Sequence, residues 1–97
     1  MRALEGMSVL ITGGGSGIGE GAAKHFANKG ATVTITGRRE EPLKQVVKDI
    51  GENITYIKGD VTNNEDRIRM VEAAVKNGKG LDVLISNAGN IYRCDVE

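Results

Sequence analysis

Residues 12–19 read Thr12-Gly13-Gly14-Gly15-Ser16-Gly17-Ile18-Gly19. The stretch follows a short apolar run, residues 8–11, and opens a segment with the pattern of a helix. Glycines let the backbone turn tightly, while free N–H groups and the positive end of the helix dipole attract an anion. We therefore expect this turn to hold a pyrophosphate. The candidate binding residues in it are Thr12, Gly13, Ser16, Gly17, Ile18 and Gly19.

A glycine-rich turn is also found as a plain structural loop, so its surroundings decide its meaning. The pattern of the chain predicts strands at about residues 7–11, 32–36, 54–58 and 81–86. Helices are expected at about residues 17–29, 42–50 and 62–78. The glycine turn thus lies between a strand and a helix, with a second strand after them. This is the context that a dinucleotide site needs.

Two of the expected helices carry clear signals. The second has an apolar stripe at the spacing i, i+3, i+4 and i+7, formed by Leu43, Val46, Val47 and Ile50. The third has the spacing of a capping box at Thr62 and Glu65. Its expected apolar face consists of Ile68, Val71, Ala74 and Val75.

Strands that alternate with helices predict an α/β fold. Crossover helices imply a parallel sheet with right-handed connections and a three-layer α/β/α arrangement. If the second and third strands lie on one side of the first and the fourth lies on the other, the strand order is 3-2-1-4. The point where the order reverses then lies beside the glycine turn, where ligands bind in open α/β sheets.

The residues after the second strand bear on which dinucleotide binds. An acidic residue about 20 positions after the glycines holds the ribose 2′-hydroxyl of NAD. Gly37 occupies that region and is followed by Arg38 and Arg39. Two guanidiniums would bind a 2′-phosphate by charge-assisted hydrogen bonds, which favours NADP(H) over NAD(H). The alternative is a solvated loop pair balanced by Glu40 and Glu41.

The ends of two further strands supply the other candidate cofactor-binding residues. Asp60 could accept a hydrogen bond from the adenine amino group, and Val61 could pack on the ring. Alternatively, Asp60 begins the turn into the third helix. The small side chains of Asn87, Ala88 and Gly89 would let the backbone pass close to a cofactor.

Composition excludes several classes of function. The 97 residues make one domain at most, and their formal net charge is zero, which argues against nucleic-acid or membrane binding by bulk electrostatics. Cys94 is the sole cysteine, so no internal disulfide forms, and His25 is the sole histidine. We expect no metal site, and we interpret Cys94 as a bystander thiol and His25 as a surface or half-buried residue of the first helix. A cytoplasmic protein is the default expectation.

Taken together, these residues resemble the short-chain dehydrogenase/reductase family from about Leu4 to Gly89. The glycine turn looks like its cofactor motif, and Asp60-Val61 look like its adenine contact. Residues 86–89 look like its Asn-Asn-Ala-Gly motif with Ser86 in the first place. The resemblance implies a Rossmann-type fold, a nicotinamide cofactor, and hydride transfer to or from a carbonyl or alcohol. Arg38 looks like the NADP-type residue of the family.

The chain departs from the family in lacking a Tyr-x-x-x-Lys sequence. Asp60 stands four residues after Tyr56, and Val96 four residues after Tyr92. We therefore assign no catalytic residue and expect residues 1–97 to form a single cofactor-binding domain that stops before the catalytic half. A nucleotide-binding module without catalysis, or a subunit completed by another chain, are the alternatives. The substrate cannot be inferred.

The last predicted strand bears on self-association. Residues 81–86 are almost continuously apolar, which suits a strand covered on both faces. With no further strand predicted beside it, this strand would be an exposed edge. Such edges pair with other chains, so we expect self-association there.

Overall fold

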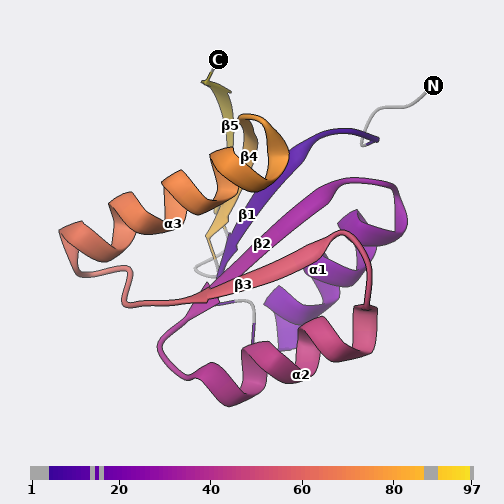
Figure 1. Ribbon diagram of the computed structural model, residues 1–97, viewed down its shortest axis with the longest axis horizontal. Helices are drawn as coiled ribbons and strands as arrows, with labels where there is room; N and C mark the ends of the chain where they lie inside the picture. Colours follow the sequence, from indigo (N-terminus) through magenta and orange to yellow (C-terminus); the bar gives the residue numbers. More distant parts are fainter. Residues whose placement is uncertain (1–4, 14, 16, 87–89, 97) are drawn as a thin grey trace.

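The computed structural model describes residues 5–13, 15, 17–86 and 90–96, the last of these segments by its backbone (Figure 1). The strands are β1 (Ser8–Thr12), β2 (Thr32–Gly37), β3 (Ile54–Lys58), β4 (Leu81–Ser86) and β5 (Asn90–Val96). The helices are α1 (Gly17–Asn28), α2 (Glu40–Ile50) and α3 (Asn64–Gly78). The predicted alternation of strands and helices is confirmed through β4.

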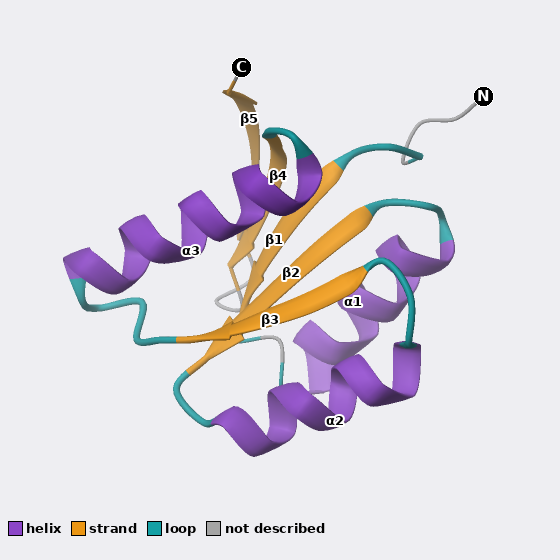
Figure 2. Cartoon of the chain, in the orientation of Figure 1, coloured by secondary structure: helices purple, strands orange, loops and turns teal. Residues whose placement is uncertain are grey.

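The strands form one sheet in the order β3-β2-β1-β4-β5. The first four are parallel, so the predicted order 3-2-1-4 is confirmed. In register, Val9 on β1 lies opposite Val33 on β2 and Val83 on β4. Figure 2 shows the sheet between two helical layers, with α1 and α2 over one face and α3 over the other. The three layers expected from the crossover helices are therefore present.

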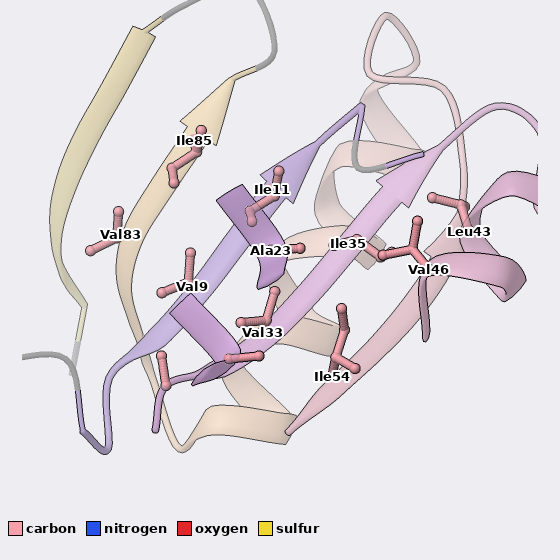
Figure 3. Close-up of a cluster of buried hydrophobic side chains, with 12 residues drawn as sticks. Val9, Ile11, Ala23, Val33, Ile35, Leu43, Val46, Ile54, Val83 and Ile85 are labelled. Atoms are coloured by element: carbon pink, nitrogen blue, oxygen red, sulfur yellow. The ribbon is translucent and has the colours of Figure 1, made fainter. Parts of the chain in front are cut away.

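The larger core lies under α1 and α2 (Figure 3). Alternate residues of the strands point to this face because side chains of a strand alternate between its two faces. Leu43 and Val46 of α2 pack on them and are buried, while Val47 and Ile50 are partly buried against the same cluster. The predicted apolar stripe of α2 is thus confirmed. Burying a side chain of this size contributes roughly 1.5–3 kcal/mol.

The predicted apolar face of α3 is partly wrong. Met70 and Ala74 are buried against the sheet, whereas Ile68 is 60% exposed and Val71 is 38% exposed. The rotation of the helix follows from Gly78, whose missing side chain lets α3 lie directly against Ser8 of β1. Met70, Ala74 and Gly78 follow at intervals of four along one face. Ile68, two residues from Met70, lies about 200° around the axis and faces away.

The start of α3 also differs from the prediction. Asn63 is the N-cap, and its Oδ1 accepts a hydrogen bond from the backbone N–H of Asp66 at 3.0 Å. Thr62 is not the cap, because the capping hydrogen bond is made by Asn63, and the Thr62 N–H donates to Asp60. The Asp60 side chain therefore accepts the Thr62 N–H that a capping box would give to Glu65, and the helix begins one residue later.

The expectation of an exposed β4 edge is wrong. β4 pairs antiparallel with β5, and Ser86 lies opposite Asn90 in the register. The segment contains residues that favour strands, among them Ile91 and Tyr92. Because Asn90 comes only four positions after Ser86, β5 returns directly along β4. The edges of the described sheet are therefore β3 and β5, and β4 does not offer the free edge on which self-association was predicted.

Candidate functional site

A cavity opens where the carboxyl ends of the parallel strands meet. Its volume is about 380 Å³, and it is bordered by the turns that follow β1, β2 and β3. The lining residues are Thr12, Gly13, Gly37, Arg38, Gly59, Asp60, Val61, Thr62 and Ser86. Five of the predicted cofactor-binding residues are among them: Thr12, Gly13, Arg38, Asp60 and Val61. The sheet topology therefore brings together residues from three separate turns, at the place where open α/β sheets bind ligands.

The glycines of the first turn meet different structural needs. Gly13 has φ of 69°, a left-handed conformation that L side chains rarely adopt. A Cβ on Gly15 would lie 2.8 Å from Cβ of Pro42, so the turn lies directly on the first turn of α2. A Cβ on Gly17 would meet nothing within 4 Å. Open space thus adjoins the N-terminus of α1, where the backbone N–H groups lack partners within the helix.

The other residues of the glycine turn lie differently. Gly19 is buried in α1, and Ile18 is 79% exposed. Thr12 ends β1, and its hydroxyl donates a long hydrogen bond to the backbone carbonyl of Ile85 at 3.5 Å. Ser16 lies outside the described residues, as do Asn87, Ala88 and Gly89.

Arg38 and Arg39 follow β2 and border a second cavity of about 260 Å³. This cavity lies between the glycine turn and the N-terminus of α2, with Gly15 and Pro42 in its wall. Both arginines are exposed. Among the described residues, neither guanidinium has a hydrogen bond or an ion-pair partner. Two positive charges therefore face a cavity at the positive end of a helix, an arrangement suited to an anion.

The carboxylate of Glu40 forms no ion pair with either of these arginines. Its Oε2 accepts a hydrogen bond from the hydroxyl of Tyr56 on β3 at 2.8 Å. This hydrogen bond is the main cause that raises the pKa of Tyr56 above its usual value. Nothing in the sequence pattern signals a contact across the 16 positions between the two residues, and sequence reasoning missed it.

Asp60 occupies a tight turn and keeps one carboxylate oxygen available. Its Oδ1 accepts from the backbone N–H of Thr62 at 2.9 Å and from the Thr62 hydroxyl at 2.7 Å. These hydrogen bonds, and to a smaller extent the nearby Arg38 guanidinium, lower the pKa of Asp60. Its Oδ2 makes no hydrogen bond to any residue that the structure describes. Asp60 therefore both starts the turn and presents an ionised oxygen as an acceptor.

Two residues of α3 hold this turn in place, and sequence reasoning missed both. Asp66 accepts from the backbone N–H of Asp60 at 2.8 Å, and it forms an ion pair with Arg69 at 2.7 Å. Arg67 donates to the backbone carbonyl of Val61 at 2.8 Å. Val61 itself is 41% exposed, so an apolar surface remains open beside Asp60.

The described part of the chain contains neither a metal-ligand cluster nor a membrane-spanning helix. Within residues 5–13, 15, 17–86 and 90–96, no group of His, Cys, Asp and Glu could hold a metal ion. None of the helices described there is long and apolar enough to cross a membrane. His25 is exposed on α1, where its ring makes an edge contact with Phe26 at a centroid distance of 5.6 Å.

Comparison with known proteins gives consistent matches. Residues 7–97 match the short chain dehydrogenase family. Secoisolariciresinol dehydrogenase of Forsythia intermedia is 47% identical over 89 residues, which cover 91% of this chain and 32% of that protein. The crystal structure of a 3-ketoacyl-(acyl-carrier-protein) reductase from Brucella melitensis, complexed with NADH, superposes with a TM-score of 0.80 at 40% identity. That match covers 84% of this chain and 34% of the reductase.

A third match agrees with these in fold and in extent. The apo glucose dehydrogenase of Caenorhabditis elegans superposes with a TM-score of 0.83 at 31% identity, over 88% of this chain and 38% of that one. The chain spans about a third of the length of the curated relatives it matches. From the glycine turn, the strand order and a family match over residues 7–97, we conclude that the chain belongs to the short-chain dehydrogenase family.

Proposed function

We propose that this chain forms the cofactor-binding part of an oxidoreductase that transfers hydride between NADP(H) and a carbonyl or alcohol. The observation that carries the preference for NADP(H) is the pair Arg38 and Arg39. Both border the cavity at the N-terminus of α2, and neither forms a hydrogen bond or an ion pair with a described residue. The complex of the Brucella melitensis reductase with NADH supports the dinucleotide part of this proposal.

The pyrophosphate is assigned to the N-terminus of α1. Gly13 turns the chain back and Gly17 leaves open space over the first turn of the helix. Backbone N–H groups and the helix dipole would stabilise the negative charge there. Thr12, Ser16, Ile18 and Gly19 complete the proposed turn.

The 2′-phosphate of the adenosine ribose is assigned to Arg38 and Arg39. Guanidiniums bind phosphate oxygens in pairs of parallel hydrogen bonds, and such charge-assisted bonds are stronger than neutral ones. NAD(H) carries a hydroxyl at this position and would leave both charges unused. No acidic side chain lies among the residues that border this cavity.

The adenine is assigned to the turn after β3. The free Oδ2 of Asp60 would accept from the amino group of the base, and Val61 would cover one face of the ring. Asn87, Ala88 and Gly89 are proposed to lie along the nicotinamide half. The bound nicotinamide supplies or accepts the hydride, while this chain binds and orients the dinucleotide and excludes water from it.

Direct binding titrations test this proposal. We expect Arg38→Gln combined with Arg39→Gln to weaken NADPH binding by roughly 100-fold or more, since each lost hydrogen bond to a charged group costs about 1.5–3 kcal/mol and two guanidiniums are removed. NADH binding should change by less than about two-fold, because no charge is lost from its contacts. Fluorescence of the reduced nicotinamide in the full-length protein reports both affinities. Lys48→Gln, in the last turn of α2, removes a charge away from the cavity and is the matched control.

Two results would overturn the assignment. Equal losses for NADPH and NADH would mean that the arginines support the fold rather than read the 2′-phosphate. A wild-type protein that binds NADH more tightly than NADPH would refute the preference directly.

A further inference from the structure

The hydrogen bond between Tyr56 and Glu40 joins an edge strand to the helix that comes after the arginines. Tyr56 lies on β3, and Glu40 is the first residue of α2. The Tyr56 ring packs against the core under α1 and α2, which holds its hydroxyl at the rim of the sheet. The 2.8 Å contact therefore fixes the Glu40 carboxylate to a rigid strand. In Figure 1, α2 runs alongside β3 at this edge of the sheet.

This contact decides where a negative charge lies in a basic loop. Glu40 directly follows Arg38 and Arg39 in the chain, and it is their nearest carboxylate in sequence. While its carboxylate accepts the hydrogen bond from Tyr56, neither guanidinium forms a hydrogen bond or an ion pair with a described residue. A phenol is protonated at neutral pH, and the hydrogen bond to Glu40 raises the pKa of Tyr56 further, so the hydroxyl keeps donating.

We propose that Tyr56 is a positioning residue for cofactor selection, which holds the Glu40 carboxylate away from the arginines and from the 2′-phosphate of NADP(H). This inference rests on the proposed function, because it assumes that Arg38 and Arg39 bind that phosphate. Tyr56 acts through Glu40 and touches no part of the cofactor.

Removal of the Tyr56 hydroxyl would change the charge balance of this loop. In Tyr56→Phe the ring still fills its place against the core, but Glu40 loses its partner. The freed carboxylate can pair with a neighbouring guanidinium and repel the 2′-phosphate. Like charges close together near a protein surface shift binding by roughly three- to ten-fold. NADH carries no charge at this position, so its affinity should stay within about two-fold.

The experiment is a double-mutant cycle measured by binding. The variants Tyr56→Phe, Glu40→Gln and their combination are titrated with NADPH and with NADH in the full-length protein. We expect Tyr56→Phe to weaken NADPH roughly three- to ten-fold. The combined variant should regain wild-type affinity, because the glutamine carries no charge to repel the phosphate. Tyr92→Phe, on β5 at the opposite edge of the sheet, is the matched control.

Each other result contradicts the inference. Equal loss of NADPH and NADH affinity in Tyr56→Phe would show a merely structural role, and so would failure of Glu40→Gln to rescue it. An unchanged NADPH affinity in Tyr56→Phe would remove the role altogether. The arginine variant separates the two proposals. If it loses NADPH selectivity while Tyr56→Phe keeps it, the inference on Tyr56 fails and the proposed function stands.

Discussion

Replacing Gly78 by alanine tests how closely α3 lies on the sheet. A Cβ built on Gly78 would overlap Oγ and Cβ of Ser8, and it would lie 3.2 Å from Cα of Ser8. Ser8 is fully buried, and its hydroxyl donates to the backbone carbonyl of Ala74 at 3.1 Å. Either α3 or β1 must therefore move, because the overlapping Cβ of Ser8 is attached directly to the strand backbone and cannot rotate away.

The magnitude is the balance of three contributions. Overpacking a tight contact costs roughly 1–3 kcal/mol. Loss of the hydrogen bond from Ser8 to Ala74 costs about 1 kcal/mol more. Against these, alanine favours a helix over glycine by up to about 1 kcal/mol. We therefore expect Gly78→Ala to lower the free energy of unfolding by roughly 1–3 kcal/mol.

Urea unfolding followed by circular dichroism measures this change, and Gly21→Ala is the matched control. Gly21 lies in α1, is exposed, and has nothing within 4 Å of the position of its Cβ. The same substitution there should stabilise the protein by about 0.5–1 kcal/mol. Opposite signs at the two glycines are the expected outcome. The reasoning is refuted if Gly78→Ala is as stable as wild type, or if Ser8→Gly, which removes the overlapping atoms, fails to relieve its cost.

Two further predictions concern the start of α3. Asn63→Ala should lower the free energy of unfolding by about 1 kcal/mol because it removes the N-cap, whereas Glu65→Ala should lower it by less than about 0.5 kcal/mol. Equal losses for the two variants in urea unfolding would instead support a capping box formed by Thr62 and Glu65. The ion pair with Arg69 and the hydrogen bond from the Asp60 N–H lower the pKa of Asp66 below its usual value. On acidification the unfolded chain therefore takes up this proton at a higher pH than the folded protein does. The stability that ionised Asp66 contributes is present above about pH 4 and is lost as the pH falls through its lowered pKa. Asp66→Asn should flatten that acid-side decline in unfolding measured from about pH 6 to about pH 2.5, and an unchanged slope would count against it.

Local patterns predicted most of the fold. The bounds of β3 and β4 agree with the prediction, as does the apolar stripe of α2. These elements are read from periodicity and from glycines that end helices, such as Gly51 with φ of 88°. Both signals act within a few residues. The strand order was predictable as well, because parallel crossovers leave few topologies for four alternating units.

The errors on α3 arose where the sequence spacing permits more than one arrangement. Ile68 belongs to an apolar stripe in sequence, yet α3 turns a different face to the sheet because Gly78 lies against Ser8. Thr62 has the spacing of a cap, yet Asp60 takes its hydrogen bonds. A contact remote in sequence selects the buried face of α3, whereas a side chain two residues away selects its N-cap.

The sequence by itself determined the order of strands and helices, the glycine turn, and the candidate residues at the strand ends, because these depend on local periodicity and backbone freedom. Only the tertiary structure decided which of those residues share a cavity. It also decided that Tyr56 donates a hydrogen bond to Glu40, while Arg38 and Arg39 form no hydrogen bond or ion pair in the described chain. The physical reason is that charge pairing and helix rotation depend on distances between residues remote in sequence. Packing of the sheet against its helices sets those distances.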